Sequence, residues 1–452
     1  MKMKKSLLAI LAMGSVAGVA HAGIPVLGND KGSVEVYGIL DAAAGHVQHS
    51  LSVDPQFPGS VNPYSAVKNN GTVPNSVNGL FNGGLQASRL GVKGGMDIGN
   101  GIKAFFTLES GINAPTGQLT NAAGCLASNA GSATTACANS SVNGQLFGRQ
   151  AFVGLSEETL GSLAVGRNYA PFYTIAANYD PLQNSDLFSP INFSGTFGGG
   201  GGVSEDSRVD SSLKYTNKFG SFNYGALYKF GGSSQGTSAK SAFALNAGYE
   251  EGNIGVQAAY QAFNDAIKGG AGSIANTVAI TNENTKAFMI AAKYKFTDAA
   301  TAKIGYITYT LSAPSDPLNT AAPFGYSYYG QAIDPTAGKG VTNFSGASQT
   351  THIIFLGGDY NLTEKLNLAA GIYNITPQQS NDYTPNAGTT TAKTGQASGT
   401  QNCVSLLADY HLTKTLDTYA GVMHTSFSGN AYPSAAYYTS NQVVALGARF
   451  KF

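Results

Sequence analysis

The sequence predicts an all-β, sixteen-stranded antiparallel barrel that crosses a membrane. Three observations lead to this prediction: an export signal at the start, no long apolar run or sustained helical periodicity after it, and strand-like segments joined by alternating short and long connections. Within a bilayer, unpaired backbone groups are so costly that only helices and closed barrels span it. An exported membrane chain without spanning helices is therefore expected to close a barrel.

Residues 1–22 have the features of a secretory signal peptide. Three lysines stand among the first five residues, an apolar stretch follows, and the sequence AHA at 20–22 supplies small residues at the cleavage positions. The apolar stretch is too short for a transmembrane helix. We expect residues 1–22 to be removed and residues 23–452 to form a single domain.

The composition argues against nucleic-acid binding. The formal net charge is +1, and removing the three signal lysines takes it to −2, so no bulk positive charge remains. Glycine is abundant at 58 residues, tyrosine and phenylalanine number 24 and 23, and only 11% of residues are charged. Composition alone leaves a large soluble β-solenoid or an adhesin open, so the order of the segments has to decide.

Sixteen segments of about ten residues have the alternating polarity of transmembrane strands. Single-chain bacterial barrels need an even number of strands, and this count satisfies that need. The predicted strands lie at 33–43, 86–97, 101–111, 145–157, 161–169, 208–217, 220–230, 240–250, 253–263, 286–297, 301–312, 350–361, 366–376, 402–412, 416–426 and 442–452.

Short and long connections alternate between these segments. Turn-forming and charged residues fill the short ones, as in the short periplasmic turns of such barrels. Long loops are unusual inside a compact soluble domain but normal on the extracellular face of a barrel. The short connections are 97–101, 157–161, 216–220, 250–253, 297–301, 362–366 and 412–416, and the long ones include 44–85, 112–144, 170–207, 264–285, 313–349 and 377–401.

Residue parity within the strands predicts a lipid face and an inner face. In the last segment Val444, Leu446 and Phe450 share one parity, while Arg449 and Lys451 share the other. Successive side chains of a strand point to opposite faces of the sheet, so the first set is expected to face lipid. An open edge in lipid would leave a row of unpaired amides, so the first and last strands are expected to pair.

Three cysteines fit an oxidising compartment. Cys125 and Cys137 lie in one Gly/Ser/Ala/Asn-rich segment and are candidates for a disulfide within a loop, the alternative being two unpaired thiols. Cys403, at the start of a predicted strand, is expected to be a small buried side chain.

The residues at five places together resemble the general porins of Gram-negative bacteria, especially the betaproteobacterial type. The resemblance implies a homotrimer, a third outer loop that folds inward to narrow the pore, and a role for Phe452 as a signal to the outer-membrane barrel assembly machinery. It rests on VEVYGILDAA (34–43), SRLGVKGGMDIGNGIKAFFTLESG (88–111), LFGRQAFVGLSEETLGSLAVGRNYAPFY (146–173), SSLKYTNKFGSFNYGALYKFG (211–231) and GARFKF (447–452).

The resemblance also implies a pore constriction in which basic residues of the wall face acids of the third loop. The third loop is expected from about Ala170 to Asp206, with Asp186 in the place of a constriction acid. A second acid, expected beside Pro190, is missing, and Glu205 and Asp206 are open candidates to replace it. The basic constriction residues are Arg89, Lys93, Arg167, Arg208 and Lys214, and further candidates for the lumen are Asp41, Glu109, Arg149 and Asp210.

One of these assignments conflicts with strand parity. Arg167 shares its parity with Leu163 and Val165, which are expected to face lipid. An inward Arg167 therefore requires the regular strand to end before it or a β-bulge to reverse the faces.

The predicted function is a water-filled outer-membrane channel for passive diffusion of ions and small hydrophilic solutes. Opposed fixed charges across a narrow aqueous gap bias ion choice, and the surplus of basic residues favours a weak preference for anions. No cofactor or metal site is expected, and the glycine run at 198–202 lacks the Lys-Ser/Thr of a phosphate-binding loop. The alternatives are a substrate-specific channel and, in third place, a barrel enzyme or an adhesin.

Overall fold

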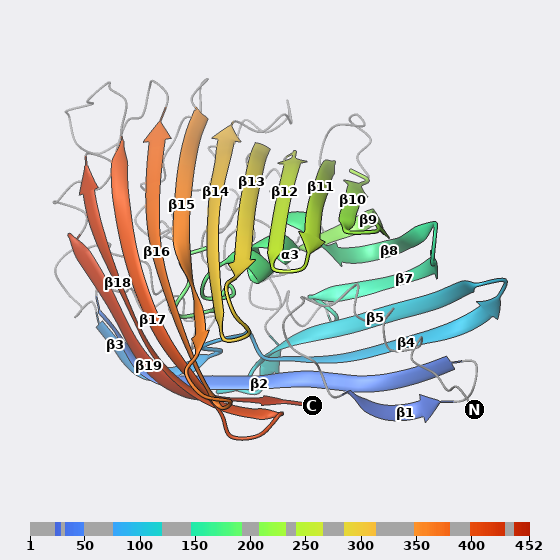
Figure 1. Ribbon diagram of the computed structural model, residues 1–452, viewed down its shortest axis with the longest axis horizontal. Helices are drawn as coiled ribbons and strands as arrows, with labels where there is room; N and C mark the ends of the chain where they lie inside the picture. Colours follow the sequence, from blue (N-terminus) through green and yellow to red (C-terminus); the bar gives the residue numbers. More distant parts are fainter. Residues whose placement is uncertain are drawn as a thin grey trace, which may run out of the picture.

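The computed structural model describes residues 23–28, 32–48, 76–119, 146–191, 208–231, 241–264, 284–312, 348–379, 398–429 and 438–452. Most of these residues lie in antiparallel strands that curve into a barrel, with a helix inside it (Figure 1). The elements are β1 (Ile24–Gly28), β2 (Gly32–Gln48), β3 (Ser76–Asn82), β4 (Arg89–Gly99), β5 (Ile102–Asn113), β6 (Gln118–Leu119), β7 (Gln150–Glu157), β8 (Gly161–Tyr169), α3 (Pro171–Tyr179), β9 (Arg208–Phe219), β10 (Phe222–Lys229), β11 (Ala242–Glu251), β12 (Ile254–Phe263), β13 (Asn284–Lys295), β14 (Ala300–Ser312), β15 (Ser348–Asn361), β16 (Leu366–Gln379), β17 (Gly399–His411), β18 (Leu416–Gly429) and β19 (Ser440–Lys451).

The sheet closes on itself. Each strand from β10 to β19 pairs with the next, β19 pairs with β2, and the order continues through β4, β5, β7 and β8 to β9, which pairs with β10. Gly38 and Phe452 exchange backbone hydrogen bonds of 2.8 and 3.1 Å beside the β2–β19 pair. The predicted sixteen-stranded closed barrel is confirmed, with β1, β3 and β6 as short additions to it.

The unexpected strand β1 covers an edge that β19 leaves open. β19 reaches β2 only as far as the Lys451↔Ile39 pair. The part of β2 before Gly38 would lack partners on that side, and β1 pairs with it from Val36 to Ser33. Because unpaired amides are costly next to lipid, the extra strand completes the wall.

The first predicted connection contains a strand, which corrects the sequence-based assignment. β2 extends to Gln48 rather than to residue 43, and β3 pairs with this extension inside the segment 44–85. β4 begins at Arg89 rather than at 86, and β7 begins at Gln150 rather than at 145. Residues 83–88, between β3 and β4, lie outside the strands of the wall.

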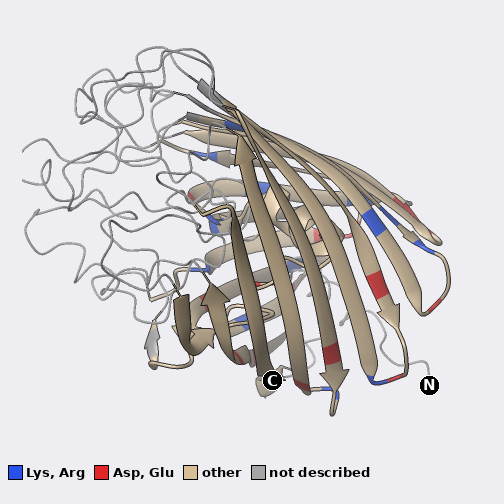
Figure 2. Cartoon of the chain, turned by 90° about the vertical axis from the view of Figure 1, so that its left-hand side faces the viewer, with Lys and Arg blue, Asp and Glu red and all other residues tan. Residues whose placement is uncertain are grey.

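The short predicted turns are all present, between β4 and β5 and then between every second pair of strands from β7–β8 to β17–β18. Four of them have a glycine with a positive φ: Gly101 at 76°, Gly161 at 83°, Gly220 at 59° and Gly252 at 57°. Side chains with a Cβ rarely adopt this region, so these glycines suit the tight reversal of direction. Charged residues are sparse along the strands in Figure 2, and several lie at the turns.

The helix α3 was not expected from the sequence. Pro171 occupies its first turn, where the fixed φ of proline suits a helix and the missing N–H costs nothing. The helix ends at Tyr179, because Pro181 disfavours helical geometry at Asp180. Within the described residues, no helix is long and apolar enough to cross a membrane.

The outer face is apolar, as parity predicts. In β19, Val444 and Leu446 are 47% and 65% exposed on the outside, while Val443 and Ala445 are buried on the inside. We expect Leu446→Arg to lower the free energy of unfolding by about 2–4 kcal/mol, because the charge enters the lipid near the middle of a strand. Glu364→Arg, at an exposed turn, is the control. Equal denaturant midpoints in lipid vesicles for both variants would contradict the lipid-facing assignment of Leu446.

Candidate functional site

Basic side chains collect on neighbouring strands of the barrel interior. Arg208 interacts electrostatically with both Arg149 and Arg167, and Glu109 interacts with both Arg89 and Arg149. The cluster therefore contains all three arginines assigned to the constriction, together with the lumen candidate Arg149. Its basic members are Arg89 in β4, Arg149 just before β7, Arg167 in β8, Arg208 and Lys214 in β9, and Lys229 in β10.

Glu109 is buried at the centre of this basic cluster. The Arg149 guanidinium donates to its carboxylate at 2.7 Å, the Tyr37 hydroxyl at 2.8 Å and the Tyr169 hydroxyl at 2.9 Å. Glu109 is 2% exposed and Arg149 is also 2% exposed. Glu109 thus lies in the interior cluster, where its buried carboxylate holds Arg149 and two tyrosines.

We expect Glu109→Gln to lower the free energy of unfolding by about 3–5 kcal/mol, because it leaves the buried Arg149 without its counter-charge. The control is Glu35→Gln. Glu35 forms a 2.7 Å ion pair with Lys93, and both side chains are partly exposed, so the expected loss is below about 1 kcal/mol. Denaturant unfolding followed by circular dichroism measures both, and equal losses would contradict the buried role of Glu109.

A break in strand register explains how Arg167 turns inward. The β8–β9 pairing shifts between Gly166 and Asn168, and Gly166 has a φ of 136°. Arg167 is consequently buried, with its Nε donating to the Gly148 carbonyl at 2.7 Å. Its guanidinium also lies 3.8 Å from Asp210. The irregularity that the parity conflict required is present at this position.

Several basic groups of the cluster bind carbonyl oxygens rather than acids. Lys214 Nζ donates to the Tyr169 carbonyl at 2.9 Å, and Arg89 Nε donates to the Ala87 carbonyl at 3.0 Å. The second acid of the cluster is Asp210, whose carboxylate lies 3.1 Å from Lys229 and also pairs with Arg167. Among the described residues, two carboxylates therefore face six cations, and this part of the interior carries a positive surplus.

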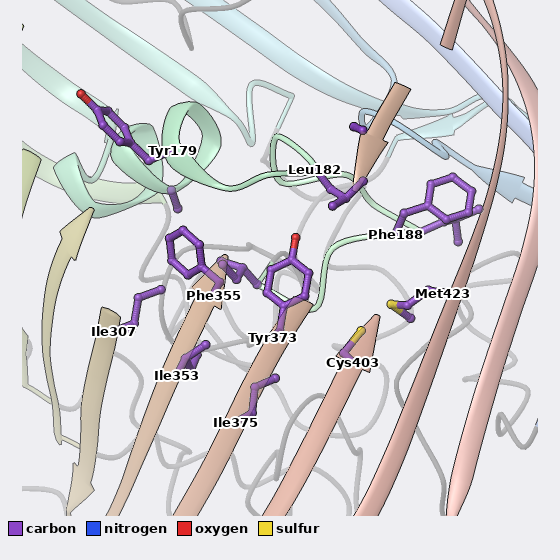
Figure 3. Packing of buried hydrophobic residues seen from close by; sticks show 14 of the residues in the cluster. Tyr179, Leu182, Phe188, Ile307, Ile353, Phe355, Tyr373, Ile375, Cys403 and Met423 are labelled. Carbon is purple, nitrogen blue, oxygen red and sulfur yellow. The ribbon is translucent and has the colours of Figure 1, made fainter. Parts of the chain in front are cut away.

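The described part of the third loop, residues 170–191, crosses the barrel interior to the wall formed by β15–β18. In Figure 3, Leu182 and Phe188 lie among inward-pointing side chains of these strands, including Tyr373, Cys403 and Met423. All five side chains are nearly or fully buried. The loop therefore fills this side of the interior with an apolar contact.

Wall glycines make room for the loop. A Cβ on Gly371 would lie 2.6 Å from Leu182, and one on Gly421 would lie 2.8 Å from Phe188. Such distances are shorter than real Cβ contacts, so these positions need glycine for the loop to approach closely.

Polar anchors hold the start of the loop. Asp180 accepts from the Tyr373 hydroxyl at 2.7 Å and from the Asn184 N–H at 2.6 Å, and Lys303 donates to its carbonyl at 3.1 Å. Burial raises the pKa of Asp180 above its ordinary value, although these donors favour the ionised carboxylate. Tyr179 donates at 2.6 Å to Glu250, which also pairs with Lys293 at 3.0 Å.

Asp186, the predicted constriction acid, and Asp41, a candidate for the lumen, both lie near residues 83–88. Asp186 is half-buried, and its Oδ2 atom is 2.6 Å from where a Cβ on Gly83 would be. Asp41 points inward, and its side chain is fully buried. Cys125, Cys137, Glu205 and Asp206 lie outside the described residues.

A family model described as Gram-negative porin matches residues 7–430. The chain belongs to this family. Outer membrane porin proteins of Bordetella pertussis and Delftia acidovorans are 32% and 27% identical to it over 229 residues, which is 50% of this chain and 48% and 50% of those proteins. The chain thus spans about half the length of the curated relatives it matches. These matches place the porin in the Gram-negative outer membrane.

Solved structures share the fold of this porin. The anion-selective porin from Comamonas acidovorans matches with a TM-score of 0.58 at 17% identity, covering 93% of this chain and all of that one. The in-vitro folded outer membrane protein OmpT of Vibrio cholerae matches with a TM-score of 0.56 at 15% identity, covering 94% of this chain and 99% of that one. At these identities the likeness concerns the barrel alone.

A second group of inner charges in this porin was not predicted as a site. Asp417 binds Arg449 and Lys451, both at 2.7 Å, and Asp409 binds Arg449 at 3.1 Å. His411 also contacts Asp417 at 2.8 Å. Possible ligand atoms of Asp409, His411 and Asp417 lie within 4.8 Å of one another, a spacing that would suit a metal ion. The two basic side chains already neutralise these acids. Parity places Arg449 and Lys451 inward, but the acids they meet depend on register across three strands.

Proposed function

We propose that the protein forms a water-filled channel through which ions and small hydrophilic solutes diffuse passively, with a weak preference for anions. The observation that carries the proposal is the positive surplus on the inner side of the strands from β4 to β10. Fixed charges beside a narrow aqueous path raise the local concentration of ions of opposite sign. The Comamonas acidovorans porin of the same fold is described as anion-selective, which supports this assignment.

The proposed partners follow from the same family. One Vibrio cholerae OmpT structure of this fold, with a TM-score of 0.53, is described as a trimer form, and we propose a homotrimer for this chain. We further propose that Phe452 takes part in recognition by the outer-membrane barrel assembly machinery. The family is one of channels, and no enzymatic activity is proposed.

The channel is tested by single-channel recording of the purified protein in planar lipid bilayers. A water-filled pore predicts stepwise insertions whose conductance rises in proportion to bulk salt, and a homotrimer predicts closure in thirds. Saturable block of the current by one class of solute would instead favour a substrate-specific channel. Barrels that resist unfolding in detergent but never conduct would contradict the proposal.

A further inference from the structure

The carboxylate of Asp41, in the middle of β2, is surrounded by hydrogen-bond donors. It accepts from the backbone N–H groups of Gly84, Leu85 and Gln86 at 3.0, 3.1 and 2.8 Å. The Tyr419 hydroxyl on β18 donates to it as well. A fully buried carboxylate is costly unless it has such partners, and these charge-assisted hydrogen bonds are stronger than neutral ones.

The backbone of Asp41 holds both ends of the same segment. Its carbonyl accepts from the Gly83 N–H at 2.8 Å and from the Ser88 hydroxyl at 2.9 Å, while its N–H donates to Ser88 Oγ at 2.9 Å. Residues 83–88 are therefore fixed to β2 at the beginning, the middle and the end. One residue of the wall thus contacts this non-strand segment along its whole length.

Residues 185–188 of the third loop, called its tip below, contact this segment. The Gly84 carbonyl accepts from the Ser185 hydroxyl at 2.7 Å and from the Leu187 N–H at 3.0 Å. Ser185 is 1% exposed, and its Oγ also accepts from the Phe188 N–H at 3.2 Å. A chain of hydrogen bonds thus runs from Asp41 through Gly84 to the tip of the loop.

We propose that Asp41 is a positioning residue of the channel, which fixes the tip of the third loop by holding residues 83–88 inside the barrel. The proposal rests on the proposed function, because it assigns Asp41 a part in setting the open path. It accounts for a carboxylate at this position: an asparagine would present an amide NH₂ to N–H groups that need acceptors. It also separates Asp41 from the basic cluster, since Asp41 acts through the loop and not through contact with ions.

Asp41→Asn tests this proposal in the full-length porin. Losing hydrogen bonds to a buried charge is expected to raise the ratio of partly closed to open time in single-channel records by about 10-fold. Amide hydrogen exchange in residues 180–191 is expected to accelerate by a similar factor. Glu35→Gln removes an inward acid of the same strand that does not contact 83–88, and both readouts should stay at their wild-type values.

A double-mutant cycle with Ser185→Ala separates positioning from a general loss of stability. If Asp41 and Ser185 act through one chain of hydrogen bonds, the exchange rates of the double variant should match those of Asp41→Asn alone. Tyr419→Phe loses one donor to Asp41, and a smaller change in the same direction is expected from it if Asp41→Asn does not fold.

Hydrogen exchange keeps this proposal distinct from the proposed function. A wild-type barrel that does not conduct would contradict the channel, while exchange in residues 180–191 would still report on Asp41. Unchanged exchange at the loop in both Asp41→Asn and Tyr419→Phe would overturn the positioning role. Fully additive effects in the cycle with Ser185→Ala would overturn it as well.

Discussion

Replacing Arg89, Arg167 and Arg208 together by glutamine is expected to remove most of the channel's preference for anions. These side chains supply half of the six cations in the basic cluster, and Asp210 would lose one of its two basic partners. Removing fixed charge beside a narrow path changes local ion concentrations steeply, and we expect the anion-to-cation permeability ratio to fall to about one.

Reversal potentials in a salt gradient measure this change. The control removes two basic residues at exposed turns, Lys365→Gln with Lys414→Gln, and should leave the ratio near that of the wild type. High salt should reduce the difference between the variants, because ions screen fixed charges over about 10 Å at 0.1 M. A triple variant with the wild-type ratio would show that these arginines do not set ion choice.

Gly421→Val is expected to displace the third loop from the wall and to increase conductance. The first added carbon would already lie 2.8 Å from the Phe188 ring, and the ring belongs to a fully buried side chain. Overpacking of this kind costs about 1–3 kcal/mol, so the free energy of unfolding should fall by that amount. If Phe188 cannot pack against the wall at position 421, the third loop narrows the aqueous path less.

Gly95→Val is the matched control, because a Cβ at Gly95 meets its nearest neighbours at 3.6 and 4.0 Å, which are ordinary contacts. Conductance steps and denaturant midpoints of the two variants give the comparison. Equal conductance of Gly421→Val and the wild type would contradict the role of the loop in narrowing the path.

The barrel was predictable because its main constraint is local. Alternation in β19 separates Val444 and Leu446 from Arg449 and Lys451, and each strand carries a similar pattern. The additions β1 and β3 were not predictable in this way, because they depend on where β19 ends along β2 and on how far β2 extends. Those are properties of register between strands, and one sequence does not fix them.

The constriction was predicted only in part, and for a related reason. The parity conflict at Arg167 correctly required an irregularity next to it, which the register shift at Gly166 supplies. The burial of Asp41 and Glu109 depends on partners 43 and 40 residues away, such as Gly84 and Arg149, and spacing along the chain does not reveal them. The sequence did indicate where the third loop contacts the wall, at Gly371 and Gly421. Glycines inside strands often mark the close approach of another segment.

Ion preference is tested most directly by the reversal potential of the unmodified porin in a bilayer that separates high from low salt. An aqueous path beside the basic cluster predicts the sign of an anion-preferring channel. Cation preference under the same conditions would contradict this prediction, because the positive surplus between β4 and β10 would then not border the path that ions take.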